Sequence, residues 1–177
     1  MLLYRYYSHR YTSLYAGSFS DGGHVRNEHG FCLSASWRPL SRLDIYAYTD
    51  WSRSYWPKYL ISRSSHSLDN MLSATYTTRR WTFGGRYRLR LRQRDNARKT
   101  ALVAYNDHRL RLYVTYATVD NRWTFHTRTD LSLTEYRERD RGWMFTESVT
   151  CRLPWLRLSL DAVYFDTDSY YSRLYAC

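Results

Sequence analysis

The sequence predicts an all-β protein, namely an antiparallel, up-and-down transmembrane β-barrel. Three observations lead to this fold class. Segments of about ten residues alternate apolar and polar side chains, which is the period of a strand with two unlike faces. Short, turn-like connections join these segments in pairs. Tryptophans lie beside the connections, and an indole ring, apolar but with one N–H donor, favours a membrane–water boundary.

The alternation identifies the strands in chain order. In 81–92, aromatic residues, leucines and one glycine occupy the odd positions, whereas threonine, glycine and four arginines occupy the even ones. About eight full strands are expected from residue 29 onward, with 1–7 as a ninth strand and 170–176 as a tenth. The other full strands are predicted at 31–37, 43–51, 68–77, 110–118, 123–133, 143–153 and 156–164.

The connections differ in length on the two sides of the predicted sheet. Outer-membrane barrels have short turns on the periplasmic side and longer loops outside the cell. Short connections are expected at 38–42, 77–80, 119–122 and 153–155, and longer ones at 8–28, 52–67, 93–108 and 136–141. The short side is therefore predicted to be periplasmic. Six tryptophans form the predicted membrane-interface belts: Trp37, Trp81, Trp123 and Trp155 at the short turns, and Trp51 and Trp143 at the opposite strand ends.

One residue conflicts with this pattern. Glu147 falls on the apolar positions of its segment, and a carboxylate facing mid-bilayer lipid costs on the order of 2 kcal/mol. A β-bulge that shifts the register near 142–155 would turn this side chain to the other face. Trp155 is also one residue out of phase with the leucines that follow it.

Composition limits the class of protein. The 177 residues suit one domain, which we assign to 1–177 as a single β-barrel region. Aromatic residues make up 18% of the chain, which excludes a disordered protein despite the net charge of +11. Of the 27 basic residues only Lys58 and Lys99 are lysines, so the rest are arginines, whose weakly hydrated guanidinium suits a crowded polar interior. No segment has the roughly 18 apolar residues of a transmembrane helix.

Cysteine and histidine show no metal-site pattern. Cys32, Cys151 and Cys177 lack CxxC spacing and form no zinc motif with the six histidines. We therefore expect three unpaired cysteines, no metal and no cofactor. The chain also has no GxSxG, HExxH or P-loop sequence, and we predict that it is not an enzyme.

The chain is expected to be an incomplete piece of a larger barrel, truncated at both ends. An outer-membrane protein must be exported, yet Met1–Leu3 leads directly into a tyrosine-rich segment without an apolar signal region. The sequence also stops at Cys177, inside another tyrosine-rich segment. Because a membrane sheet cannot leave an edge exposed to lipid, the remaining barrel strands are expected to be absent from this chain.

The sharpest local feature is a row of arginines at every second position from 86 to 92. In a strand they point to one side, roughly 7 Å apart. Two interpretations remain open: a cationic stripe in a lumen that binds anionic solutes, or a ladder neutralised by carboxylates such as Asp44, Asp50, Asp130 and Asp161. The aromatic residues lie on the opposite face, which disfavours nucleic-acid stacking. The predicted lumen-facing residues are Arg86, Arg88, Arg90, Arg92, Arg111, Arg128, Asp130, Arg157, Asp161 and Asp44.

Several short motifs occur in a fixed order along the chain. They are Tyr4–Ser8, Tyr15–Ser20, Asn27–Gly30, Trp37–Leu40, Arg86–Arg88 followed by Arg94–Asn96, Phe165–Tyr170 and Ser172–Tyr175. In this order they resemble the C-terminal β-barrel region of bacterial outer-membrane proteins that carry helix-hairpin-helix (competence-type) modules upstream. The resemblance implies an outer-membrane barrel whose upstream soluble part binds DNA. Nucleic acid would then be a partner only through modules missing from this chain, and no catalytic residue is carried over.

These observations predict a protein of the outer membrane of a Gram-negative bacterium, with a pore, transport or anchoring role. Outer-membrane lipid and an anionic solute are its expected partners. The alternative is a soluble β-barrel or sandwich that binds an anionic ligand or nucleic acid through its arginine-rich face. A third interpretation is a non-functional gene fragment.

Overall fold

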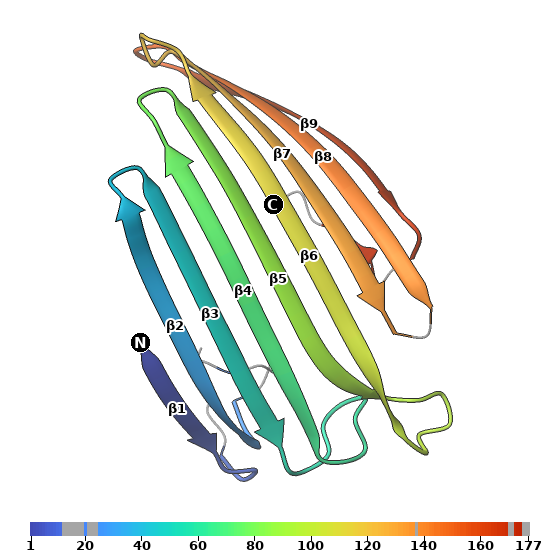
Figure 1. The fold of residues 1–177 in the computed structure, drawn as a ribbon. Coiled ribbons are helices and arrows are strands. Elements are labelled where there is room, and N and C mark those ends of the chain that lie inside the picture. The colour runs from blue at the N-terminus through green and yellow to red at the C-terminus, as the bar shows by residue number, and fades with distance from the viewer. Residues whose placement is uncertain (12–19, 21–24, 137, 170–171, 175–177) are drawn as a thin grey trace.

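The protein is a single antiparallel sheet of nine strands, seen in a computed structural model that describes residues 1–11, 20, 25–136, 138–169 and 172–174. The strands pair strictly in chain order, as an up-and-down meander (Figure 1). No helix among the described residues is long and apolar enough to cross a membrane. The strands are β1 (Leu2–Tyr7), β2 (Glu28–Leu40), β3 (Leu43–Ser54), β4 (Ser65–Thr77), β5 (Trp81–Asp95), β6 (Leu102–Ala117), β7 (Trp123–Glu135), β8 (Arg139–Arg152) and β9 (Arg157–Thr167).

The predicted strands are confirmed, but the sheet is not closed into a barrel. All eight full strands and the ninth at 1–7 are present. Most of the predicted tenth strand, 170–176, lies outside the described residues, and 172–174 are not in a strand. Ser172 instead packs on the inner face of β8, where its carbonyl oxygen would lie 2.4 Å from a Cβ placed on Gly142. The sheet therefore has two edges, β1 and β9, with no strand paired to them in the described chain.

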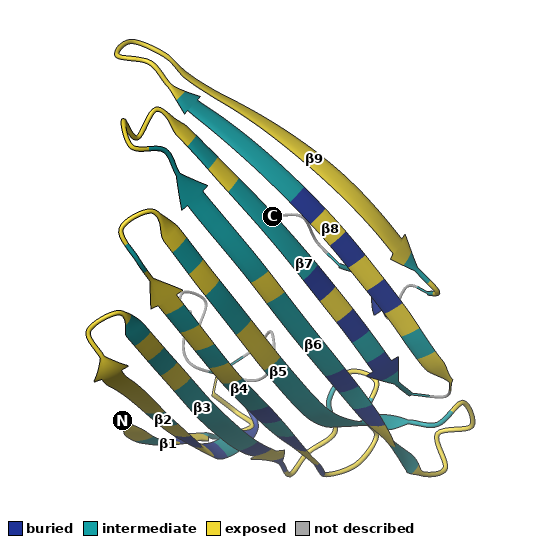
Figure 2. Cartoon of the chain, turned by 45° about the horizontal axis from the view of Figure 1, so that its top comes forward, coloured by how far each residue is buried: buried dark blue, intermediate teal, exposed yellow. Residues whose placement is uncertain are grey.

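The sheet has two unlike faces, as the period-two alternation requires. We call the face that carries Trp81 and Leu112 the outward face, and the face that carries Arg88 and Asp130 the inner face. Burial alternates along parts of β4, β7 and β8, whereas β9 is exposed almost throughout (Figure 2). Among the described residues only three hydrophobic side chains are buried: Cys32, Tyr105 and Met144. The sheet thus has no apolar core of its own.

The connections at the two ends of the sheet differ less in length than the sequence predicts. The strands β5 and β6 extend to Asp95 and from Leu102, so the predicted 93–108 loop shrinks to 96–101. The connection between β7 and β8 is 136–138, which is shorter than the 118–122 turn. The strands are longer than predicted because polar residues at their loop ends still pair through the backbone. Hydropathy does not reveal a strand where both faces carry polar side chains. Long connections remain at 8–27 and 55–64.

The β-bulge considered near Glu147 is absent. Every residue of β7 from Trp123 to Glu135 has a partner in β8, without interruption. Glu147 therefore stays on the outward face, where its carboxylate accepts a hydrogen bond of 2.6 Å from the Thr127 hydroxyl. The Thr127 hydroxyl partly offsets the cost of placing a carboxylate there. An irregularity occurs instead between β2 and β3, after Trp37.

The turn 118–122 illustrates how the short connections are built. Asn121 has a φ of 54°, a conformation that asparagine tolerates better than most residues. The Thr118 hydroxyl donates a hydrogen bond of 2.7 Å to Asp120. That hydrogen bond lowers the pKa of the Asp120 carboxyl, because it stabilises the charged form.

Tyr113 packs directly across Gly84 on the inner face. A Cβ on Gly84 would lie 2.0 Å from Tyr113 Cζ, whereas a Cβ on Gly85, on the outward face, would lie 3.3 Å from Leu112 Cδ2. We expect Gly84→Ala to lower the free energy of unfolding by about 1–3 kcal/mol, because the ring must leave its position. Gly85→Ala is expected to leave it unchanged or slightly raised. Urea unfolding of both variants is the measurement, and equal effects would contradict the packing of Tyr113.

Candidate functional site

The inner face concentrates charge on three neighbouring strands. In the register of β5 and β6, Arg86 is opposite Arg111 and Arg88 is opposite Arg109. Like charges directly opposite destabilise a sheet unless carboxylates separate them. The inner face of β5–β7 also carries Arg90, Arg92 and Arg128.

Three aspartates bind most of these arginines. Asp69 of β4 contacts Arg88 at 2.5 Å and Arg90 at 3.0 Å. Asp107 of β6 lies 3.0 Å from Arg109 on the same strand. These carboxylates are buried, whereas the side chains of their arginine partners remain 26–39% exposed.

Asp130 of β7 is the third of these aspartates and bridges two arginines. Its Oδ1 accepts a 2.5 Å hydrogen bond from Arg111, and its Oδ2 lies 2.7 Å from Arg128 Nε. Arg128 Nε and Asp130 Oδ2 are within ion-pair distance of each other but do not form a hydrogen bond with each other. We therefore treat the Arg128 contact as ionic.

Within the arginine row, Arg88 and Arg90 are paired with Asp69, which is not one of the four carboxylates considered from the sequence. Of the four carboxylates considered, only Asp130 binds an arginine of the β5–β7 group. Asp44 pairs with Arg38 at the exposed short-turn end, and Asp161 and Arg157 lie on the exposed strand β9. Among the described residues, no ion pair is formed by Arg86. Eight arginines face three aspartates on the inner side of β4–β7, so this surface keeps an excess of positive charge.

A buried ionic cluster at β1 was not foreseen from the sequence. Arg5 donates hydrogen bonds to Glu28 at 2.7 Å and to Asp50 at 2.6 and 2.9 Å, and both Arg5 and Glu28 are buried. The alternation of residues 1–7 places Arg5 on the inner face, and this was the one feature of the sequence from which the cluster could have been predicted. Asp50 is therefore occupied by β1 and not by the β5 row.

The connection 55–64 folds over the inner face and is attached on both sides. Trp56 exchanges backbone hydrogen bonds of 2.7 and 3.0 Å with the Asn27 side chain. On the other side, the Asp95 amide donates to the Leu60 carbonyl at 3.2 Å, and Ser62 donates two bonds of 2.9 Å to the Asp95 carboxylate. Leu60 has a φ of 63°, which is strained for a leucine and is held by these contacts.

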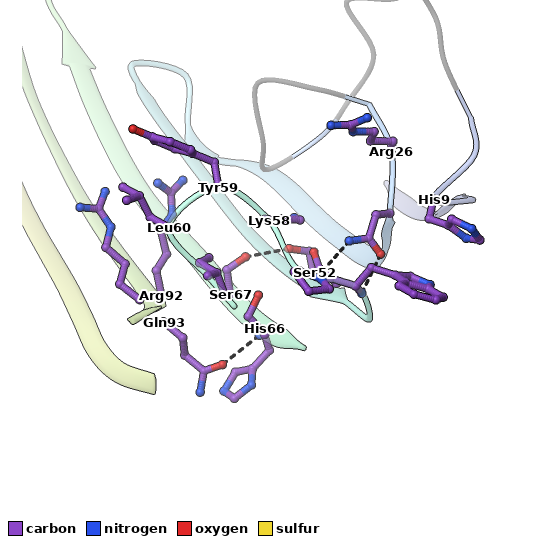
Figure 3. Close-up of a pocket in the computed structure, with 17 residues that line it drawn as sticks. His9, Arg26, Ser52, Lys58, Tyr59, Leu60, His66, Ser67, Arg92 and Gln93 are labelled. Atoms are coloured by element: carbon purple, nitrogen blue, oxygen red, sulfur yellow. Dashed lines mark hydrogen bonds between the residues drawn. The ribbon is translucent and has the colours of Figure 1, made fainter. Parts of the chain in front are cut away.

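Under this connection lies a cavity of about 940 Å³, which we call the loop cavity. Serine side chains from β3 and β4 line it, with Ser52 and Ser67 hydrogen-bonded at 2.7 Å. Arg92 and Arg26 lie at opposite sides of the cavity (Figure 3). Among the residues that the structure describes, its charged lining residues are Arg26, Lys58, Arg92 and Arg94, and none is Asp or Glu.

The outward face presents apolar side chains without a protein partner. Leu72, Leu112 and Phe145 are exposed by 53%, 50% and 40%. Of the six predicted belt tryptophans, Trp81 and Trp123 begin β5 and β7, and Trp155 lies in the connection 153–156, where it is 82% exposed. Trp37, Trp51 and Trp143 lie three or four residues inside the ends of β2, β3 and β8. Between the two belts, the described strands place no arginine or lysine on this face. Among these residues the one acidic side chain is Glu147.

Cysteine and metal chemistry have no visible site in the described chain. Cys32 and Cys151 are free thiols, and Cys177 lies outside the described residues. No group of three His, Cys, Asp or Glu side chains in the described ranges is arranged to hold a metal ion.

Comparison with protein-family models, with curated proteins and with solved structures found no match for this chain.

Proposed function

We propose that this sheet forms part of the wall of an outer-membrane β-barrel, with a pore, transport or anchoring role. The observation that carries the proposal is the segregation of charge. The chain has 27 basic residues, and none of those that the structure describes lies on the outward face between the tryptophan belts. Arginine at a bilayer midplane costs about 2–4 kcal/mol. A water-facing surface would have no reason to exclude arginine from such a basic chain.

The absence of an apolar core supports the same proposal. Leu112 and Leu158 are about half exposed, at 50% and 54%, and a single sheet offers them nothing to pack against. A soluble β-sandwich would cover this face with a second sheet, which the described residues do not supply. Lipid is the environment in which such a face is stable without a protein partner.

The dimensions of the outward face fit a bilayer. The odd positions of β5 from Trp81 to Leu91 are apolar or glycine. At roughly 3.3 Å per residue and a tilt of about 40°, this band is roughly 25 Å tall, the height of the apolar band of an outer-membrane barrel.

The stagger between strands also supports barrel geometry. A line of register partners runs across the sheet from Trp37 on β2 to Tyr164 on β9. Trp37 lies three residues before the end of β2, whereas Tyr164 lies seven residues after the start of β9. Such a progressive shift tilts the strands against a common axis, as barrel closure requires. In a bilayer, β1 and β9 would pair with further strands.

The helix-hairpin-helix resemblance adds one element to this proposal. A DNA-related role would belong to upstream modules of the kind found in that family. The anionic partner proposed for the inner face itself is a small solute.

Detergent dependence tests the proposal. The unfolded chain is expected to refold in micelles or bilayers, with a gel mobility that changes on boiling, and to aggregate in plain buffer. A monodisperse, folded species in plain buffer would instead support the soluble anion-binding alternative. Expression with an added export signal is expected to place the chain in the outer-membrane fraction, and its absence there would favour the gene-fragment interpretation.

Charge in the lumen predicts ion selectivity. Neutralising Arg86, Arg88, Arg90 and Arg92 together is expected to shift the reversal potential of the reconstituted protein toward cation selectivity, because four positive charges are removed and Asp69 loses both of its arginine partners. The measurement is a salt gradient across a planar bilayer. Neutralising Arg79, Arg80 and Arg122 at the short turns is the control, and an unchanged potential in the fourfold variant would remove the lumen assignment.

A further inference from the structure

We propose that the outward face binds the phosphate of an anionic membrane lipid through His29, Arg53 and His66. We call these three residues the headgroup row. The inference rests on the proposed function, because a lipid headgroup reaches this face from the side only if the sheet stands in a bilayer. It names the lipid chemistry that the long-loop end of the sheet would recognise.

The headgroup row crosses three neighbouring strands in register. His29 of β2 is opposite Arg53 of β3, and Arg53 is opposite His66 of β4. Residues directly opposite each other point to the same side of a sheet. Because adjacent strands lie about 4.8 Å apart, the three side chains leave the outward face side by side over roughly 10 Å. A guanidinium and two imidazoles can each donate hydrogen bonds to phosphate oxygens.

The headgroup row lies immediately beyond the apolar band. Phe31, Trp51 and Leu68 form the next outward-facing row toward the short turns. Two residues along a strand advance about 7 Å, which is about 5 Å along the bilayer normal at a strand tilt of about 40°. The headgroup layer outside the hydrocarbon core is about 5–7 Å thick on each side. With Trp51 at the boundary of the core, the headgroup row lies at the depth of lipid phosphates.

The acidic residues of the same three strands point to the other side of the sheet. They all belong to the inner face: Glu28, Asp44, Asp50 and Asp69. Arg5 and Arg88 bind three of them there. Arg53 therefore presents its charge on a side to which β2, β3 and β4 contribute no carboxylate. An anionic headgroup in the membrane would offset that charge.

Aromatic rings position the basic side chains at this level. The Arg53 guanidinium lies 5.0 Å from the centroid of the Tyr55 ring. The His29 ring lies 4.7 Å from the Tyr55 ring and 5.7 Å from the Trp51 ring. These contacts restrict the side chains before any ligand binds, so less conformational entropy is lost when a phosphate is bound.

An open hollow of about 530 Å³ lies beside the headgroup row. Among the described residues, Arg53, His66 and Gln93 bring polar groups to its lining, and Trp51 and Leu102 bring apolar surface. The Gln93 side chain is held in place by accepting a hydrogen bond of 3.1 Å from the His66 amide (Figure 3). A headgroup joined to its acyl chains presents a polar and an apolar part together, so this lining fits a lipid better than a free phosphate ion.

The test is native mass spectrometry of the full chain, refolded in neutral-detergent micelles that contain equal amounts of phosphatidylglycerol and phosphatidylcholine. We expect phosphatidylglycerol to be retained preferentially and saturably, because the choline cation compensates the phosphate of the other lipid. Arg53→Gln is expected to weaken phosphatidylglycerol binding about fivefold, which is the contribution of one arginine near an anionic membrane surface. Arg53→Lys keeps the charge and is expected to keep the binding.

Arg94→Gln is the matched control. Arg94 follows Gln93 on β5 but points to the inner face, so this variant removes the same charge at a similar height on the other side of the sheet. Its binding of phosphatidylglycerol is expected to be unchanged. Equal retention of the two lipids, or equal binding by Arg53→Gln and Arg94→Gln, would overturn the inference.

Glycerol 3-phosphate distinguishes a lipid from a soluble phosphate. It is expected not to displace phosphatidylglycerol, and displacement at a similar concentration would show that the headgroup row binds free phosphate. A chain that folds only in micelles but does not prefer phosphatidylglycerol would refute this inference alone. A chain that folds in plain buffer and binds phosphatidylglycerol vesicles through Arg53 would refute the membrane proposal alone.

Discussion

Replacing Asp130 with asparagine is expected to lower the free energy of unfolding by about 3–5 kcal/mol, which is the cost of removing one partner from a buried ionic group. The Asp130 side chain is 6% exposed and contacts both Arg111 and Arg128. Asparagine keeps the shape of the side chain but removes its charge. Two guanidinium groups then remain close together beside a neutral amide, and their repulsion adds to the loss.

Asp44 offers a matched control for this variant. Asp44 forms a contact of 2.5 Å with Arg38, the same distance as between Asp130 and Arg111. The side chains of Asp44 and Arg38 are, however, both more than half exposed. An exposed pair contributes about 0–1 kcal/mol, so Asp44→Asn is expected to change stability little. The measurement is urea unfolding in micelles for both variants. Similar losses in the two would show that burial does not determine the strength of these pairs.

The strands and their faces were predictable because they depend on local information. Each strand shows its two faces through alternation over about ten residues, and the backbone follows this period. The inward direction of Arg88 and the outward direction of Leu112 follow from parity alone. The β-bulge considered near Glu147 does not occur, and the Thr127 hydroxyl provides a partner for the carboxylate on the outward face. Such a cross-strand contact cannot be read from the hydropathy of the sequence.

The ion pairs and the loop cavity depend on register and on distant segments, which the sequence does not display. Asp50 was expected near the β5 arginines, but the register places it opposite Cys32 and Asp69, where Arg5 reaches it. The cavity requires Asn27 and Asp95 to anchor the same connection, although they are far apart along the chain. Likewise, closure of the sheet depends on what pairs with β1 and β9, and alternation within each strand carries no information about that.

Introducing arginine at Thr129 is expected to reduce insertion and stability by about 2–4 kcal/mol, the cost of a guanidinium at the bilayer midplane. Thr129 lies on the outward face of β7, between Leu112 and Phe145, near the middle of the apolar band. On the neighbouring strand, Ser148 is a similar short hydroxyl residue that is also half-buried. It faces the inner side, opposite Asp161, so Ser148→Arg gains an opposite charge.

The two substitutions therefore add the same charge at comparable positions and differ in the medium that the new side chain meets. The measurement is the folded fraction of each variant after refolding into bilayers at a series of urea concentrations. We expect Thr129→Arg to fold at markedly lower urea than the unsubstituted protein, and Ser148→Arg to match it. Snorkelling cannot rescue Thr129→Arg fully, because Trp123 and Leu133 place the position several residues from either boundary. Equal behaviour of the two variants would mean that the outward face does not meet lipid.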